Sequence, residues 1–473
     1  MAIDRRRLAR LIADEEARFA ARNPRSAALF REASGCLLGG VPMHWMVRSA
    51  GQFPIFVDAA RGAHFTSVDG DNYVDFCLGD TGAMAGHAPR AAAQAVSERM
   101  AAGATFMLPT RDAVWVGREL TRRFGLPLWQ FALTATDANR FAIRLARHVT
   151  GRPKLLVFNW CYHGTVDETF ATLTADGRVE QRAGNLGPPV HPRETTRVVE
   201  FNDVPGLAAA LAAGDVAAVL CEPALTNIGI VHPDPGFHDA LRDLTRRAGT
   251  LLIIDETHTI SAGPGGFTRA HGLQPDMLVI GKPIAGGVPA AAYGFSAELA
   301  ARLTGRIRDD ESDTGGIGGT LAGNALSLAA MRSTLEHVLT DDAFEHMIAL
   351  GARCEAGIAG VIAAHGLPWI VKRLGCRVEF WTSPTPPRNG AEAAAAVDAE
   401  IDRYMHLACL NRGLLLTPFH NMMLICPQTT AADVDRLTTV FAEAVELLLG
   451  LRDADAGAGA GGGAGGGGAR SRL

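Results

Sequence analysis

The chain has 473 residues, of which 48% are hydrophobic and 20% are charged, and its formal net charge is −5 at pH 7. This length is enough for two or three domains around a large shared core. Nothing in this charge balance indicates the basic surplus typical of nucleic-acid-binding proteins, so we expect a soluble globular protein without a nucleic-acid partner.

Neither the start of the chain nor its cysteines indicate a secreted or membrane protein. No apolar run approaches the roughly 20 residues of a membrane span, and the arginine-rich start lacks an apolar signal core. The acidic residues at 14–16 argue against a transit peptide, so we expect an exposed amphipathic helix there. The eight cysteines are scattered without a CxxC pair, which favours buried free thiols over disulfides or a metal site. We therefore expect a cytoplasmic protein with no bound metal and no membrane partner.

After the first helix, short alternating runs surround Asp69-Gly70, which is a hairpin signature. We assign residues 1–75 to an N-terminal segment that packs with a smaller domain. The next stretch, GDTGAMAGHAP at residues 79–89, is rich in glycine and small residues. Its backbone can therefore approach a ligand or a neighbouring subunit closely.

From about residue 89 to 336, helical stretches alternate with short apolar strands. The pattern predicts helices over residues 91–103, 112–125 and 237–249, and strands over residues 154–159, 217–223, 251–256 and 277–282. Such alternation predicts an α/β fold with a doubly wound, mostly parallel sheet, here in a large domain at residues 76–335. Residues 336–453 mix helices and strands and predict a smaller α+β domain, while the Gly/Ala-rich residues 454–473 predict a disordered tail.

Two predicted strands end in charged residues. The run LLIID ends at Asp255, and the run MLVIG is followed by Lys282. Both charges therefore lie at the carboxyl ends of strands, the edge where open α/β sheets bind ligands. Lysine is rare in this chain, because only Lys154, Lys282 and Lys372 occur among 45 basic residues. A primary amine can form an imine and a guanidinium cannot, so Lys282 is a candidate nucleophile; the alternative is a lysine that only caps a strand.

A strand-to-helix turn contains Thr134, Ala135 and Thr136. Hydroxyls and free N–H groups at a helix N-terminus suit a phosphate. The alternative is that Thr136 is simply the N-cap of the helix, which Gly151 is expected to end.

Further groups follow neighbouring strands at the same edge. Tyr162 and His163 come after strand 154–159, where an aromatic ring either stacks on a flat ligand or belongs to the core. Asn227 follows the strand that ends at Cys221-Glu222-Pro223. Several strands thus direct polar or aromatic side chains to one place.

The ordered set of these motifs resembles the class III (subgroup II) aminotransferases. It comprises the phosphate turn, YHG, EP, DE, GK with Gly286-Gly287, GT and AGN, over about residues 50–335. This family includes the ω-amine transaminases and glutamate-1-semialdehyde aminomutase. The resemblance implies a fold type I enzyme that uses pyridoxal 5'-phosphate and works as a homodimer with its sites at the subunit interface.

The resemblance also implies roles for individual residues. Lys282 would bind the cofactor covalently, and Asp255 would pair with the pyridine nitrogen, which makes the ring an electron sink. Tyr162 matches the aromatic residue that stacks on one face of the ring, and Thr257 lies where the family covers the other face. The remaining implied cofactor contacts are Thr134, Ala135, Thr136, His163, Asn227 at the ring hydroxyl, and Thr320, which would reach the phosphate from the partner subunit.

Three positions depart from the family pattern near the cofactor. Ala135 replaces a glycine, Asp137 replaces a glutamate, and DETHT replaces the common DEV. The Cβ of Ala135 would restrict the turn if the turn needed a positive φ.

The substrate side of the site departs as well. Many relatives bind the acceptor carboxylate with an arginine shortly after a proline, but this chain reads TPFHNMM, with Phe419 and His420. This favours a more apolar pocket, for which Trp45, Met46 and Phe419 are the candidates, although Trp45 could equally be a core residue. Arg48 and Arg412 are alternative carboxylate ligands.

The leading hypothesis is a transaminase that moves an amino group from an amine or a β-/ω-amino acid to a keto acid such as pyruvate by a ping-pong mechanism. The freed Lys282 would act as the general base. A second hypothesis is an intramolecular aminomutase of the glutamate-1-semialdehyde type, supported by Asn227 and the segment GKPIAGGVP. A third is a cofactor-free binding protein that keeps only the fold, motivated by the altered phosphate turn.

Overall fold

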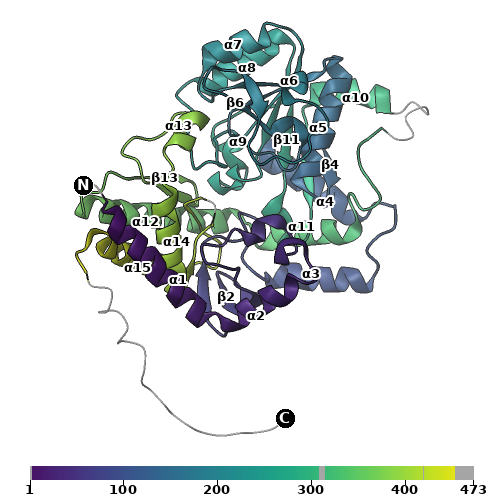
Figure 1. The fold of residues 1–473 in the computed structure, drawn as a ribbon. Helices are drawn as coiled ribbons and strands as arrows, with labels where there is room; N and C mark the ends of the chain where they lie inside the picture. The colour runs from purple at the N-terminus through teal and green to yellow at the C-terminus, as the bar shows by residue number, and fades with distance from the viewer. Residues whose placement is uncertain (1–2, 308–314, 419, 453–473) are drawn as a thin grey trace.

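The computed structural model describes residues 3–307, 315–418 and 420–452 (Figure 1). Phe419 and the Gly/Ala-rich stretch 454–473 lie outside the described residues. A seven-stranded sheet has the order β4-β12-β11-β10-β9-β5-β8, in which β12 is antiparallel to both neighbours and the other pairs are parallel. Its strands are β4 (Leu128–Ala132), β5 (Lys154–Phe158), β8 (Thr196–Val199), β9 (Val216–Cys221), β10 (Leu251–Asp255), β11 (Met277–Ile280) and β12 (Ala291–Phe295).

Both faces of this sheet are covered. Every residue of β9, β10, β11 and β12 is buried, as expected of continuous apolar runs in a parallel sheet. Helix α5 (Ala135–Thr150) packs on the strands at the centre of the sheet and ends at Gly151, whose φ of 69° permits the left-handed C-cap. The predicted α/β architecture is therefore confirmed.

Three of the other helices in this part match the predicted ranges 91–103, 112–125 and 237–249. The helices of this part besides α5 are α3 (Arg90–Ala101), α4 (Arg111–Phe124), α6 (Pro192–Thr195), α7 (Val204–Leu211), α8 (Phe237–Ala248), α9 (Gly266–Ala270), α10 (Ala297–Ile307) and α11 (Ala325–His337). Two short strands, β6 (Ala171–Leu173) and β7 (Val179–Gln181), form a separate hairpin.

The C-terminal part contains a three-stranded antiparallel sheet. Its strands are β13 (Ile370–Leu374), β14 (Arg377–Trp381) and β16 (Met422–Leu424). The accompanying helices are α12 (Asp341–Ala364), α13 (Gly390–Ala395), α14 (Ala399–Asn411) and α15 (Ala431–Leu449). By length and composition α12 could cross a membrane, a test that core helices of soluble proteins also pass. Its buried side chains pack in the core against α15 and β14.

The N-terminal part joins the C-terminal part through a second sheet. It consists of β1 (Val57–Arg61), β2 (His64–Ser67), β3 (Asn72–Asp75) and β15 (Leu414–Leu415). The hairpin predicted at Asp69-Gly70 joins β2 to β3. Helix α1 (Arg5–Arg22) precedes α2 (Pro24–Ala33) and lies beside α14 and α15 (Figure 1). The expectation of an exposed first helix was wrong for one face, because Leu8, Leu11 and Phe19 are buried there.

Candidate active site

A cavity of about 990 Å³ opens at the carboxyl ends of β10 and β11. Its walls come from the edge of the large sheet, from the N-terminal segment and from Pro418 near the end of the chain. Among the predicted residues, it is lined by Trp45, Met46, Thr134, Ala135, Thr136, Tyr162, Asp255, Thr257 and Lys282. Residues that end or follow four strands, β4, β5, β10 and β11, therefore lie around one cavity, as the sequence predicted.

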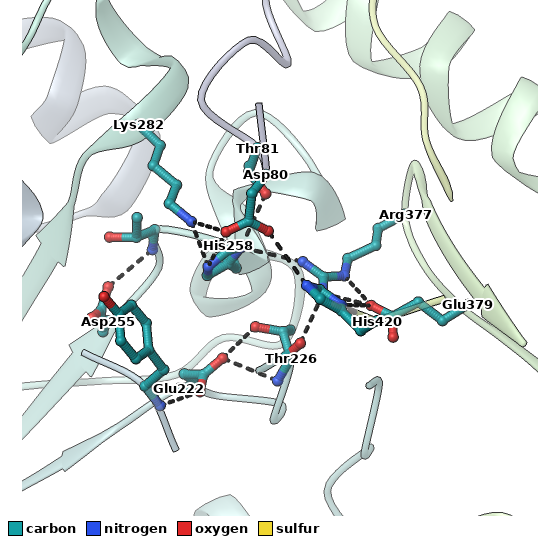
Figure 2. A network of polar contacts seen from close by, with 12 residues as sticks. Asp80, Thr81, Glu222, Thr226, Asp255, His258, Lys282, Arg377, Glu379 and His420 are labelled. Atoms are coloured by element: carbon teal, nitrogen blue, oxygen red, sulfur yellow. Dashed lines mark hydrogen bonds and ion pairs between the residues drawn. The ribbon is translucent and has the colours of Figure 1, made fainter. Parts of the chain in front are cut away.

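Lys282 follows β11 and begins the short turn η5 (Lys282–Ala285). Its φ of 53° lies in the left-handed region, which costs a residue other than glycine about 1–3 kcal/mol and occurs most often at functional sites. Nζ of Lys282 donates to Oδ2 of Asp80 at 2.9 Å and lies 2.6 Å from Nε2 of His258 (Figure 2). The amine is therefore held at the cavity by two partners.

Asp255 is a buried carboxylate that three groups hold in place. Oδ2 accepts hydrogen bonds from Asn139 Nδ2 at 2.8 Å and from His163 Nδ1 at 3.0 Å, and Oδ1 accepts one from the Thr257 N–H at 3.1 Å. Burial by itself would raise the pKa of Asp255, but these hydrogen bonds and the charge of His163 lower it below its ordinary value. His163 is buried behind Asp255 and does not line the cavity, so it positions this carboxylate.

The predicted phosphate turn lies between β4 and α5. Thr134 is the N-cap, since its Oγ1 accepts a hydrogen bond from the Asp137 N–H at 3.1 Å, so the alternative that Thr136 caps the helix was wrong. Ala135 does not have a positive φ, and its Cβ therefore causes no strain. A Cβ added at Gly164, whose φ is 79°, would lie 2.2 Å from Oγ1 of Thr136, so this side of the turn is tightly packed.

Sequence reasoning missed a group of charged side chains beside Lys282. Asp80 lies in the loop after β3, where its own φ is 52° and that of Thr81 is 77°. Burial would raise the pKa of Asp80, but the neighbouring Lys282 holds it well below its usual range. The motif GDTG contains Asp80 and could have drawn attention to it, but its glycines were interpreted as a sign that the backbone approaches a ligand closely.

The C-terminal part contributes three more side chains, Arg377, Glu379 and His420, to the charged group beside Lys282. Nε of Arg377 donates to Oε1 of Glu379 at 2.7 Å, and both side chains are buried in β14. His420 lies between two carboxylates, with Nε2 at 3.5 Å from Asp80 Oδ1 and Nδ1 at 3.5 Å from Glu379 Oε1. No short sequence motif joins these residues to Asp80 and Lys282, from which they are distant in the chain.

Comparison with known proteins identifies the family. The sequence model of the class-III aminotransferases matches residues 45–445. The chain belongs to the class III aminotransferases. It is 33% identical over 434 residues to glutamate-1-semialdehyde 2,1-aminomutase from Sorangium cellulosum (strain So ce56), covering 90% of this chain and 97% of that protein. These enzymes use pyridoxal 5'-phosphate, so the predicted cofactor and family are confirmed.

Solved structures give the same assignment. A glutamate-1-semialdehyde aminomutase from Pseudomonas aeruginosa PAO1 is 50% identical with a TM-score of 0.93, covering 95% of this chain and all of that one. A lysine-to-alanine variant of that enzyme was solved in complex with PMP. An ω-transaminase from Sphaerobacter thermophilus is 29% identical with a TM-score of 0.81, covering 90% and 98% of the two chains. The fold is therefore fold type I of the pyridoxal-phosphate enzymes.

Pyridoxal 5'-phosphate fits the cavity of this class III aminotransferase. The N-terminus of α5 with Thr134 and Thr136 suits the phosphate, Asp255 suits a protonated ring nitrogen, and Lys282 suits the covalent link. Thr257 adds a buried hydroxyl with no hydrogen-bond partner among the described residues. When bound, the cofactor supplies an electron sink, beside which Tyr162 offers a ring face.

Several other predicted residues are placed elsewhere in this aminotransferase. Asn227 donates to the Trp160 carbonyl at 3.1 Å and lines a separate cavity of about 70 Å³, so the structure does not bring it to the cofactor cavity. Thr320 is exposed and does not line the cavity of its own chain. Arg412 donates to Glu15 at 2.9 Å, away from the cavity, which removes it as a carboxylate ligand.

Proposed function

We propose that this class III aminotransferase is an aminomutase that moves an amino group between neighbouring carbon atoms of one substrate, with glutamate 1-semialdehyde as the first candidate. Curated relatives at 30–33% identity and the 50% identical structure are named for this activity. The leading hypothesis from the sequence was a transaminase with a separate keto acid, and we now consider this function the second candidate after the aminomutase.

The environment of His420 supports this proposal most directly. A transaminase must recognise the carboxylate of a keto acid, and many relatives do so with an arginine at this place in the chain. Here His420 stands at that place, lies between Asp80 and Glu379 and does not line the cavity, so it offers no cation to the carboxylate of a keto acid. An intramolecular reaction has a single substrate, so its site does not need to bind the carboxylate of a separate keto acid.

The carboxylate of that one substrate also needs a cation in the cavity. Among the described residues that line the cavity, Arg48 is the one arginine. Arg377 is buried and bonded to Glu379, so it is not available to a ligand. We infer that Arg48 binds the substrate carboxylate at the mouth of the cavity.

The residues of the chain divide the chemistry between them. With pyridoxal 5'-phosphate bound, Asp255 would hold a proton on the ring nitrogen, and Tyr162 and Thr257 would contact the ring. Lys282 would hold the cofactor and, as a free amine, would serve as the general base that takes a proton from the substrate carbon. Asp80 keeps the freed amine directed at the cavity.

The test is isomerisation of a single substrate. Holoenzyme is mixed with glutamate 1-semialdehyde alone, and the position of the amino group is followed by NMR. We expect conversion to the isomer without any added keto acid, and none with Lys282→Ala. If no isomer forms, and an amine plus pyruvate yields alanine instead, the aminomutase proposal is wrong.

One observation favours the transaminase as the second candidate. Much of the cavity wall is apolar, and on the side of the N-terminal segment and α14 it includes Ile55, Phe56, Phe65, Leu410 and Leu415. Such a surface suits an amine with a large apolar group better than a small acid. The experiment above separates the two candidates, because the transaminase yields product only when the acceptor is present. The cofactor-free alternative is not retained, since the family uses pyridoxal phosphate.

We further propose a homodimer in which Thr320 serves the phosphate of the partner subunit. Thr320 is exposed, and so are the large apolar side chains of Leu38, Met107, Leu108 and Leu321. Exposed apolar patches commonly mark interfaces. Light scattering on a sizing column should give twice the chain mass; a monomer with full activity would contradict the proposal.

A further inference from the structure

Six side chains form a closed ring of polar contacts that includes the reactive amine (Figure 2). Two sides of the ring meet at Lys282, whose Nζ contacts Asp80 Oδ2 and His258 Nε2. The ring continues through Arg377, Glu379 and His420, and returns to Asp80. It therefore connects the lysine after β11 with β14 of the C-terminal part.

The ring determines which nitrogen of His258 carries the hydrogen. Arg377 Nη1 lies 3.2 Å from Nδ1 of His258, and a guanidinium can only donate. Nδ1 must therefore accept, and the hydroxyl of Thr81, 3.0 Å from the same atom, donates to it as well. The hydrogen of the neutral imidazole then lies on Nε2, which is 2.6 Å from Lys282 Nζ.

We propose that His258 is a positioning residue for Lys282, whose Nε2–H donates to the lone pair of Nζ and so favours the unprotonated amine. Asp80 accepts an N–H of the same amine, which fixes its direction. An ammonium could not accept this hydrogen bond, so the protonated lysine is disfavoured relative to a site with an apolar residue at position 258. The inference rests only on the lysine chemistry that both candidate functions share.

The surroundings of His258 agree with a neutral ring. The side chain is 8% exposed, and burial is the largest cause that holds its pKa well below the usual range. The charged or titratable groups that face it are Lys282, Asp80, Arg377 and His420, of which Asp80 alone favours the imidazolium. A lysine that takes a proton from substrate would return it more readily beside this neutral donor.

The rarity of lysine makes a direct test possible. The full-length chain without cofactor is labelled with limiting acetic anhydride at a series of pH values, and the modified peptides are quantified by mass spectrometry. Lys154 and Lys372 are internal references in every sample. Since loss of one hydrogen bond to the amine changes its protonation equilibrium by about tenfold, His258→Met should move the labelling midpoint of Lys282 up by about one pH unit.

Two further variants sharpen the comparison. His258→Gln retains an amide N–H that can donate to Lys282, so its midpoint should move less than half as far. His238→Gln changes another histidine, which bonds the Pro223 carbonyl at 2.7 Å, and should leave the midpoint unchanged. Thermal unfolding of each variant shows whether it is folded.

The inference would be overturned if the labelling midpoint of Lys282 in His258→Met moved to lower pH or did not move. If Lys282 were an ammonium donating to His258, the loss of an acceptor would move the midpoint of a folded His258→Met variant to lower pH. An unchanged midpoint would mean that His258 has no influence on the amine. Neither result would affect the isomerisation test, which measures the product.

Discussion

Acid should destabilise the C-terminal part through His406 in α14. This ring is 5% exposed, its Nε2 contacts Asn421 Oδ1 at 2.9 Å, and its Nδ1 has no hydrogen-bond partner among the described residues. Burial lowers the pKa of His406 from 6.5 to about 4. The unfolded chain therefore binds a proton that the folded chain excludes between these values, so stability present above pH 6.5 is lost as the pH falls towards 4.

The size of this effect follows from the shift. At 1.36 kcal/mol per pKa unit, the free energy of unfolding should fall by about 2 kcal/mol between pH 7 and pH 5, and by about 3 kcal/mol at pH 4, from this group alone. Because Asn421 follows His420, the loss of order should begin beside the active site.

Urea unfolding at pH 7 and pH 5, followed by circular dichroism, measures the effect. His406→Gln keeps a neutral side chain of similar size and cannot take up the proton. We expect the variant to lose about 2 kcal/mol less than the wild type over this interval. Equal pH dependence of the two proteins would refute the assignment of the acid sensitivity to His406.

Three further outcomes concern the cofactor site. Lys282→Ala should lower turnover by about 10²–10⁴-fold and abolish borohydride trapping of the cofactor, whereas the control Lys154→Arg should retain both, because Lys154 lies far from the cavity. Asp255→Asn removes the charge that holds the ring proton and should lower turnover on the order of 10²-fold with the fold intact, as steady-state kinetics and melting would show; unchanged turnover would exclude its role. Gly164→Ala places a Cβ against Thr136 and forces a positive φ, so the cofactor dissociation constant should rise about tenfold in fluorescence titration; an unchanged constant would mean that this turn does not bind the phosphate.

Much of the large domain could be predicted because its signals are local. The buried runs that became β10 and β11 are continuous apolar segments, and Gly151 ended α5 where a left-handed cap was expected. The strand-end rule then located Asp255 and Lys282 at one edge. The first helix was predicted correctly as a helix but not as a packed one, since burial depends on α14, almost 400 residues further along the chain.

The family and the cofactor of this aminotransferase could be predicted from the sequence alone, and so could the position of the candidate Lys282 at a strand end, since these depend on residue types in a fixed order along strands. The surroundings of that lysine could not be predicted and became visible only in the folded chain. Asp80, the pair Arg377 and Glu379 of β14, and His420 come from three separate segments, and their contacts exist because the fold places these segments side by side. In the sequence, His258 was only an unusual residue in DETHT. In the folded chain, the guanidinium of Arg377, 119 residues away, contacts Nδ1 of His258 and so determines that the ring hydrogen lies on Nε2.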